Sequence, residues 1–440
     1  MVENATMASG QPCFEVAADG VWTWFNDRRA LLDEDGTLLV GYVRSDGDIA
    51  VTRMNLETGT RAEALLGTVA TREVDDHNNP SLCVLHDKRV IAVYSRHGTD
   101  SRYHWRLSKG AQPVRDEDWE EERTRTVETR TTYANVVQLG GTNQPLMNFH
   151  RCLNWNPTIS LSRDQGESWS DPVHFIQTGT GRTRPYVRLA TNGRDRIDIF
   201  YTDGHPREVP ENSIYHLYFQ GGAFFRSDGT QVARMEELPI DHDAGEGGTL
   251  VYRDGTPLKT GGGPQAPTRH GGRAWIWDAG YDDAGNPVCV FQSRRGDVTG
   301  SGWEHDRIDY GYERWTGTTW TVVAVAKAGR PLYHKERDYG GGIVLDPRDG
   351  SRVFLSSNAK APFDLSGEPE EALAPEARYS LYSAVVRKGT IPSARIRTPE
   401  SGKIIRPFVA SSGADAVLLW IEGDYRTYRD FSTRVMGFRL

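Results

Sequence analysis

The chain has 440 residues, of which 37% are hydrophobic and 25% charged, a composition typical of a folded globular protein and not of a disordered one. Its net charge of −8 at neutral pH excludes capture of nucleic acid by bulk attraction, so an acidic polymer would have to be held locally. No run of about 18 apolar residues occurs, and we therefore expect no membrane-spanning helix.

Turn-plus-strand units recur along the chain, and no long amphipathic helix is predicted between them. Their apolar centres are spaced by about 50 to 65 residues, with one wider gap that holds the Gly-rich stretch 245–272, expected to be a loop insertion. We therefore predict an all-β fold with a single seven-bladed β-propeller over residues 21–440, preceded by an N-terminal extension over residues 1–20. Two β-sandwiches are the alternative, although no Pro/Ser-rich linker divides the chain. The seven units are 33–43, 86–95, 141–149, 192–202, 282–291, 347–357 and 411–421.

The stretch 75–98 predicts a β-hairpin, because two short apolar runs are joined by a polar turn. His77 comes just before the first run and His97 just after the second. In an antiparallel hairpin these two positions lie at the same end, so the imidazoles should face each other at one rim of the sheet. Asn79 lies beside them as a neutral hydrogen-bonding partner. Paired histidines can exchange protons near neutral pH, which indicates a site at this rim.

The following units repeat this geometry. Tyr133 comes before one strand pair and Arg151 ends its return strand, while Tyr186 and His205 flank the next pair. Inner strands of neighbouring blades converge on the central channel of a propeller, so these side chains should gather at one rim with room for a ligand between them.

Residues 162–169 match the pattern S-x-D-x-G-x-x-W, with Ser162, Asp164, Gly166 and Trp169 at the defining positions. This is the Asp-box known from sialidase-like propellers, in which Asp and Gly make a tight turn between outer strands. The motif supports the fold and not an activity.

The motifs HNNPS, SRHG, TYAN, WNPT with its Asp-box, RPY and DGHP occur in this order between residues 77 and 206. These motifs and their order resemble those of the seven-bladed propeller polysaccharide lyases that cleave ulvan, and of a related group that cleaves the rhamnose–glucuronate bond of gum arabic. The resemblance is strongest over residues 75–206 and thin after residue 245.

The resemblance implies β-elimination on a uronic acid within an acidic polysaccharide, with no cofactor for catalysis. A base removes the proton α to the carboxylate, and neutralising the carboxylate charge stabilises the enolate that forms. Arg151 would neutralise the carboxylate. We favour His97 as base and Tyr133 as acid, with His77 in contact with the carboxylate or leaving oxygen; alternatively, Tyr133 would be both acid and base if the proton and the leaving oxygen are on the same face of the sugar. Asn79 and Tyr186 would bind the sugar.

A structural zinc is a further expectation from the resemblance. Three imidazoles and a thiolate suit tetrahedral zinc, although the spacing of these residues is not diagnostic. The predicted ligands are His205, His270, Cys289 and His305.

Two other functions compete with a lyase. A sialidase-like glycoside hydrolase would share the fold and the Asp-box, but the F-R-I-P motif of sialidases is absent. A non-catalytic carbohydrate-binding propeller would not need histidine, tyrosine and arginine at one rim.

We expect a monomer that binds neither nucleic acid nor membrane. Residues 1–16 lack a basic and apolar leader pattern, so the protein is expected to be secreted with its signal peptide missing from this chain, or else cytoplasmic.

Overall fold

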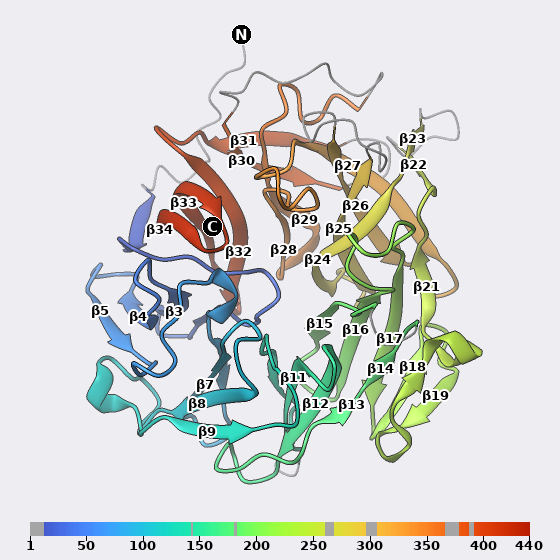
Figure 1. Ribbon diagram of the computed structural model, residues 1–440. Helices are drawn as coiled ribbons and strands as arrows, with labels where there is room; N and C mark the ends of the chain where they lie inside the picture. The colour runs from blue at the N-terminus through green and yellow to red at the C-terminus, as the bar shows by residue number, and fades with distance from the viewer. Residues whose placement is uncertain are drawn as a thin grey trace.

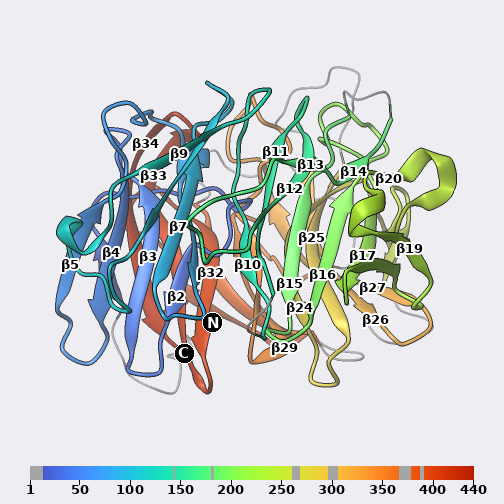
Figure 2. The ribbon, with the colours of Figure 1, turned by 90° about the horizontal axis from the view of Figure 1, so that it is seen from below.

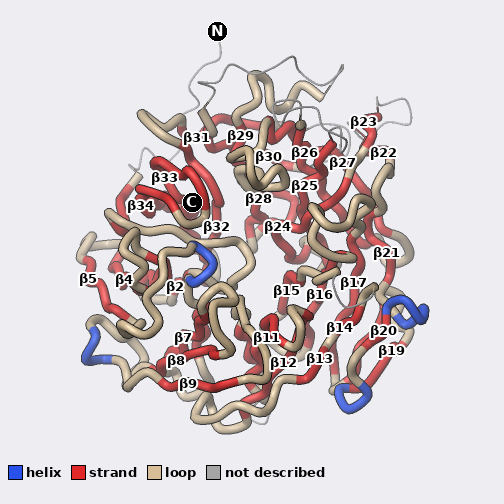
Figure 3. The backbone as a smooth tube through the Cα atoms, viewed as in Figure 1, coloured by secondary structure: helices blue, strands red, loops and turns tan. Residues whose placement is uncertain are grey.

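In the computed structural model, seven small sheets surround a central channel, which confirms the seven-bladed β-propeller (Figure 1). The structure describes residues 13–141, 144–179, 183–259, 268–295, 306–365, 378–386 and 391–440. The strands run along the height of the ring (Figure 2), and the few helices are short (Figure 3). None of the described helices is long and apolar enough to span a membrane.

Blades 1 to 3 are antiparallel sheets in which the first strand lines the channel and the next three lie successively farther out. The strands are β2 (Ala30–Leu32), β3 (Thr37–Val43), β4 (Ile49–Asn55) and β5 (Arg61–Leu65) in blade 1, β6 (Ser81–Val84), β7 (Val90–Ser95), β8 (Arg102–Leu107) and β9 (Arg123–Thr126) in blade 2, and β10 (Val136–Gln138), β11 (Leu146–Cys152), β12 (Asn156–Ser162) and β13 (Val173–His174) in blade 3. Successive side chains of a strand point to opposite faces of the sheet, so strands such as β3 and β7, in which every residue is buried, pack against neighbouring blades on both faces.

Blades 4 and 5 carry additional strands, some of which come from the stretch 245–272. We predicted this stretch to be a loop insertion, and that prediction is wrong where it forms strands. Part of it forms β21 (Thr249–Tyr252) on blade 4, and another part forms β22 (Pro257–Lys259) and β23 (Thr268–His270) on blade 5. The remaining strands are β15 (Val187–Thr191), β16 (Arg196–Thr202), β17 (Ile214–Gln220), β18 (Ala223–Arg226) and β19 (Gln231–Arg234) in blade 4, and β24 (Arg273–Tyr281), β25 (Pro287–Arg295), β26 (Arg307–Trp315) and β27 (Trp320–Gly329) in blade 5.

The ring closes in blade 7, where the N-terminal strand β1 (Phe14–Ala17) pairs with the C-terminal strand β34 (Asp430–Arg439). The expected extension over residues 1–20 therefore needs correction, since β1 belongs to the propeller. Blade 7 also contains β32 (Lys403–Ser412) and β33 (Asp415–Thr427), and blade 6 contains β28 (Ile343–Asp346), β29 (Asp349–Ser357), β30 (Ser380–Val385) and β31 (Ser393–Arg397). The shorter elements are β14 (Ile176–Gln177), β20 (Ile240–Asp241) and the helical turns η1 (Asp76–Asn78), η2 (Asp116–Asp118), η3 (Met235–Glu237) and η4 (His242–Glu246).

The Asp-box lies where the sequence predicts it, in the turn between β12 and β13. The Asp164 carboxylate accepts hydrogen bonds from the Ser162 hydroxyl and the Ser168 backbone N–H. Gly166 has φ of +86°, a conformation that favours glycine, and Trp169 is buried. The motif thus fixes a blade corner.

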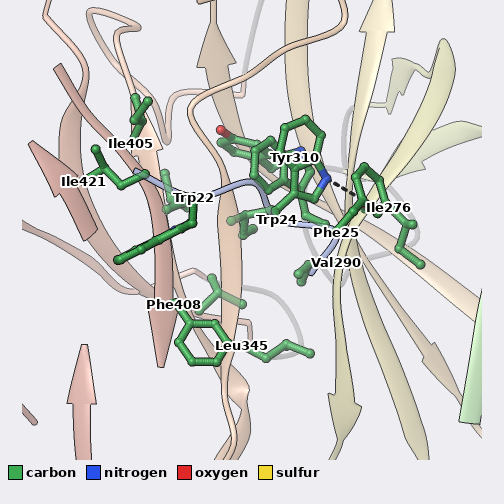
Figure 4. Packing of buried hydrophobic residues seen from close by; sticks show 14 of the residues in the cluster. Trp22, Trp24, Phe25, Ile276, Val290, Tyr310, Leu345, Ile405, Phe408 and Ile421 are labelled. Carbon is green, nitrogen blue, oxygen red and sulfur yellow. Dashed lines mark hydrogen bonds between the residues drawn. The ribbon is translucent and has the colours of Figure 1, made fainter. Parts of the chain in front are cut away.

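A segment that we call the strap, residues 20–29, runs from β1 to β2 across the channel and fills its centre with aromatic rings (Figure 4). The Trp24 ring stacks on Trp277 with centroids 4.1 Å apart, and the Trp22 indole N–H donates to the Arg406 carbonyl. Phe25 lies 4.6 Å from the Tyr186 ring. The strap therefore joins blade 7 to the rings that surround the predicted site.

Candidate active site

The two rim histidines meet as the hairpin pattern predicts. Strands β6 and β7 pair antiparallel, which brings η1 with His77 beside the loop with His97. Their imidazole rings are stacked, with centroids 3.8 Å apart and an interplanar angle of 15°. His77 is buried, whereas 23% of the His97 side chain is exposed. Of this pair, His97 therefore offers the larger surface to a ligand.

Tyr133 and Arg151 come from blade 3 and lie next to the histidines. An isolated bridge joins Thr132 to Arg151 with two backbone hydrogen bonds of 2.9 Å, which sets Tyr133 beside the end of β11. The Tyr133 ring centroid lies 5.7 Å from that of His77 and 6.1 Å from that of His97. The structure thus brings these four predicted residues together at one rim.

The Tyr133 backbone has φ of +61°, in the left-handed region that is unusual for a bulky residue. Such conformations persist where the surroundings fix them, often at functional sites. Here the neighbouring Ala134 N–H donates to the Asn26 side chain of the strap, and the Phe25 ring lies 5.7 Å from the Tyr133 ring. The strap therefore helps to hold the Tyr133 side chain toward the histidines.

The Arg151 side chain is 5% exposed and lies over the Tyr186 ring at 4.3 Å. Its Nε donates to the Trp155 carbonyl, but its Nη2 is buried and has no hydrogen-bond partner among the described residues. A buried guanidinium N–H without an acceptor is costly, so this atom is a natural binding point for an anionic group.

The ionisable groups of the site have unlike proton affinities. Burial raises the pKa of Tyr133 well above its usual value, so the phenol stays protonated at neutral pH. Burial lowers the pKa of His97, and the neighbouring His77 lowers it further. Burial opposes protonation of His77 as well, but the carboxylates of Asp76 and Asp75 outweigh it and raise its pKa to about 10. One imidazole is therefore cationic and the other neutral.

Asn79 has a supporting position. It is fully buried, and its side-chain oxygen accepts a 3.0 Å hydrogen bond from the Thr23 backbone N–H in the strap. Its direct contact with a sugar stays a prediction, but the geometry favours a role in holding the strap. Tyr186, by contrast, packs against Arg151 at the site itself.

Sequence reasoning missed several residues that the fold adds to this site. Asp75 lies between the two histidines, and Tyr339 Oη lies 3.3 Å from His77 Nε2. Tyr428, in the turn between β33 and β34, lies with its ring nearly perpendicular to both imidazoles, and Arg429 Nε donates to Asp75 at 2.9 Å. Only the acidic pair before His77 was visible as a local signal.

The predicted zinc ligands are only partly described. His205 lies next to Trp275, with ring centroids 4.7 Å apart, and Trp275 pairs with Gln292 of β25. Cys289 is three residues from Gln292, or about 10 Å along the strand, so His205 and Cys289 do not suit one ion. The His270 side chain and His305 lie outside the described residues. The zinc site stays a prediction, which elemental analysis of the purified protein can test.

A different group of potential ligands, Asp75, His77 and His97, has its ligand atoms within 4.8 Å of one another. The stacked rings argue against a shared ion, however. An imidazole binds a metal in its own ring plane, and two stacked rings with centroids 3.8 Å apart and an interplanar angle of 15° do not direct their lone pairs at one ion. We therefore interpret this group as a carboxylate-bridged histidine pair.

A cavity of about 420 Å³ lies farther along the channel. Its lining combines aliphatic residues of the inner strands, such as Leu82, Val136 and Leu345, with charged residues that include Asp27 and Asp278. It does not contain the histidine pair or Tyr133. The chemistry of the rim residues, and not cavity size, therefore identifies the candidate active site.

The fold and site define the protein as a seven-bladed propeller with histidine, tyrosine and arginine side chains clustered at the channel rim. The model of the BNR repeat-containing family matches residues 38–328, and the chain belongs to this family. No curated protein sequence matches the chain.

Among solved structures, the fold is similar to that of the polysaccharide lyase PL25 ulvan lyase bound to -[GlcA(1-4)Rha3S]-, with a TM-score of 0.66, 14% identity, and coverage of 96% of this chain and 95% of that one. The polysaccharide lyase Uly1 has a TM-score of 0.55 and 12% identity, with 97% of each chain covered. At such identities the likeness concerns the fold alone.

Proposed function

We propose that the protein is a polysaccharide lyase that cleaves a rhamnose–glucuronate linkage in an acidic polysaccharide by β-elimination. The observation that carries this proposal is the placement of four side chains at one rim: the His77 and His97 rings are stacked, the Tyr133 ring centroid lies 5.7 Å and 6.1 Å from them, and the guanidinium of the buried Arg151 lies 5.8 Å from the Tyr133 ring. Burial and the neighbouring charges favour a neutral His97, a protonated Tyr133 and a cationic His77. A β-elimination needs a base, an acid and a cation at neighbouring positions.

The cation requirement comes first, because the proton α to a carboxylate is acidic only when the carboxylate charge is neutralised. Arg151 Nη2 has no partner among the described residues and suits one carboxylate oxygen. The cationic His77, whose ring centroid lies 5.7 Å from that of Tyr133, supplies a second positive charge. Together they would stabilise the enolate as it forms.

Proton transfer then requires one acceptor and one donor. His97 accepts the C5 proton, the C–H electrons form the C4–C5 double bond, and the C4–O bond breaks. Tyr133 gives its phenolic proton to the leaving oxygen, which becomes the hydroxyl of the departing sugar. The phenolate formed is reprotonated from solvent, and His97 releases its proton, which restores both groups.

The sugar ring is expected to lie over these side chains, with only its carboxylate reaching inward toward Arg151. The cavity bounded by Tyr133, Arg151 and Tyr186 is about 20 Å³, large enough for a water molecule but not for a sugar ring, and neither histidine of the pair lines it. The exposed part of His97 and the half-buried Trp155 and Tyr428 border the approach from solvent. Their rings provide surfaces on which a sugar can stack.

The resemblance of the motifs to propeller lyases and the fold shared with an ulvan lyase support this function. A glycoside hydrolase would need a pair of carboxyl groups that face the substrate. Asp75 and Asp76 are fully buried and engaged with histidine and arginine side chains, and Glu336 is paired with Arg207. These three carboxyl groups therefore do not form such a pair, which favours elimination over hydrolysis.

The test is incubation of the purified protein with ulvan and, separately, with gum arabic, while the ultraviolet absorbance of an unsaturated uronate is recorded. A rise in absorbance that the Tyr133→Phe variant largely loses supports the proposal. New reducing ends without absorbance would indicate a hydrolase, and binding of either polymer without cleavage would indicate a carbohydrate-binding propeller. Either of these results would overturn the proposal.

A further inference from the structure

On the basis of the proposed function, we infer that Asp75 is a positioning residue that holds both histidines by their Nδ1 atoms. His97 then presents the lone pair of its Nε2 atom as the base, while the additional proton of the pair is kept on His77. The carboxylate is not expected to touch the substrate. It acts through the two imidazoles, and its role is absent from the motifs in the sequence.

The contacts divide the Asp75 carboxylate between the two rings. Oδ1 accepts from His77 Nδ1 at 2.7 Å, and Oδ2 lies 3.2 Å from His97 Nδ1. Oδ1 also accepts the His77 backbone N–H at 3.1 Å, which caps η1. Asp75 is fully buried, so these partners replace the water that a carboxylate would otherwise bind.

The two histidines keep this carboxylate ionised, because their interactions, those of His77 foremost, outweigh the effect of burial and hold the pKa of Asp75 far below its usual range. Arg429 Nε also donates to Asp75 Oδ2, at 2.9 Å. An ionised carboxylate only accepts hydrogen bonds, so both Nδ1 atoms must carry hydrogen. A neutral His97 then has its lone pair on Nε2, on the opposite side of the ring from Asp75.

A second carboxylate makes the pair asymmetric. Asp76 Oδ1 lies 2.9 Å from His77 Nδ1, whereas Asp75 is the only carboxylate in contact with His97 among the described residues. Two parallel imidazolium rings 3.8 Å apart would repel each other, so the pair holds one positive charge more readily than two. The charge therefore stays on His77, which has two carboxylates.

Other groups around the pair keep this arrangement. Arg406 neutralises the second oxygen of Asp76, with a 2.6 Å contact from its Nη1, and Tyr425 donates to the same oxygen. The remaining titratable groups that face the histidines are Tyr133, Tyr339 and Tyr428, with Glu336 and His205 farther out and Tyr333 packed behind Tyr339. Of these, only Glu336 is a carboxyl, and burial raises its pKa.

The Asp75→Asn variant tests this inference, because an amide keeps the shape but has one acceptor and one donor group. Its NH₂ group cannot accept from an Nδ1–H, so one histidine must take the other tautomer. We expect kcat to fall by roughly 10²-fold or more with little change in KM, since the base loses its orientation. Asp75→Glu retains the charge and should recover part of kcat.

The decisive readout is nitrogen NMR of the histidine side chains in the full chain, labelled with ¹⁵N-histidine. Signals are assigned by their loss in His77→Gln and His97→Gln. At pH 8 we expect His77 to be doubly protonated and His97 to be neutral with hydrogen on Nδ1. In Asp75→Asn the titration of His77 should move down by about one pH unit or more. The buried Asp346, paired with Arg348 at a distant turn, provides the control Asp346→Asn, which should leave both signals unchanged.

A wild-type His97 with hydrogen on Nε2, or a His77 that is neutral at pH 8, would overturn the inference whatever the activity of the enzyme. Conversely, absence of cleavage in ulvan and gum arabic with the expected NMR spectrum would reject the proposed function and leave the role of Asp75 as positioning residue intact. Thermal unfolding shows whether Asp75→Asn folds; if it does not, the wild-type spectrum still decides.

Discussion

Replacement of Tyr133 by Phe isolates the proposed proton donor. The side chain is 4% exposed, and Phe keeps the ring that contacts Phe25 and lies 5.8 Å from the Arg151 guanidinium. Only the hydroxyl is lost, so folding stability should change by about 1 kcal/mol or less. Loss of a general acid typically lowers turnover by roughly 10²–10⁴-fold, which corresponds to about 2.7–5.4 kcal/mol in the activation barrier.

The assay is the initial rate of ultraviolet absorbance increase over a range of polymer concentrations, which separates kcat from KM. We expect kcat to fall and KM to change little, because the hydroxyl acts in the transition state. Tyr42 in β3 is the matched control: it is equally buried, its hydroxyl contacts Thr52 and Glu63, and it lies in blade 1 away from the rim residues. If Tyr133→Phe keeps kcat within a few-fold of the Tyr42→Phe value, Tyr133 is not the acid.

Three further changes test other parts of the argument. Arg151→Lys keeps the charge but loses the planar guanidinium and its hydrogen bond to the Trp155 carbonyl, so kcat/KM should drop by about 10²-fold or more in the same assay. Near-normal activity would contradict carboxylate binding by this guanidinium. Burial and His77 hold the pKa of His97 below its ordinary value of 6.5. The rate should therefore decline with falling pH only below pH 6.5, where the base becomes protonated. A midpoint of the pH–rate profile above neutrality would exclude His97 as base. Trp24→Ala should lower the free energy of unfolding by about 3–5 kcal/mol in denaturant titrations, since it removes the ring at the centre of the strap. The control Val69→Ala, at an exposed position, should change the free energy of unfolding by less than about 0.5 kcal/mol. Similar effects of the two variants would refute the structural role of the strap.

Local patterns in the sequence were sufficient for the repeating part of the fold. The hairpin of β6 and β7, the Asp-box turn and the seven strand units depend on residues close in sequence, whose alternation and turn chemistry act over a few positions. Closure of the ring follows from the predicted propeller, but the pairing that closes it and the strands in the stretch 245–272 were not predictable from local patterns. They depend on pairing between β1 and β34 and between β21 and β17, which are distant partners.

The same distinction holds for the candidate site. The sequence by itself determined that His77 and His97 share one rim and that Tyr133 and Arg151 flank the next blade, because antiparallel strands fix which ends meet. Only the tertiary structure decided their surroundings: ring closure brings Arg429 to Asp75 from 354 residues away, and the strap seats Phe25 against Tyr133. It also decided the proton affinities, since burial and the placement of Asp75 and Asp76 make one imidazole cationic and leave its neighbour neutral. Side-chain identity sets the ordinary pKa, but desolvation and neighbouring charge exist only once the chain has folded.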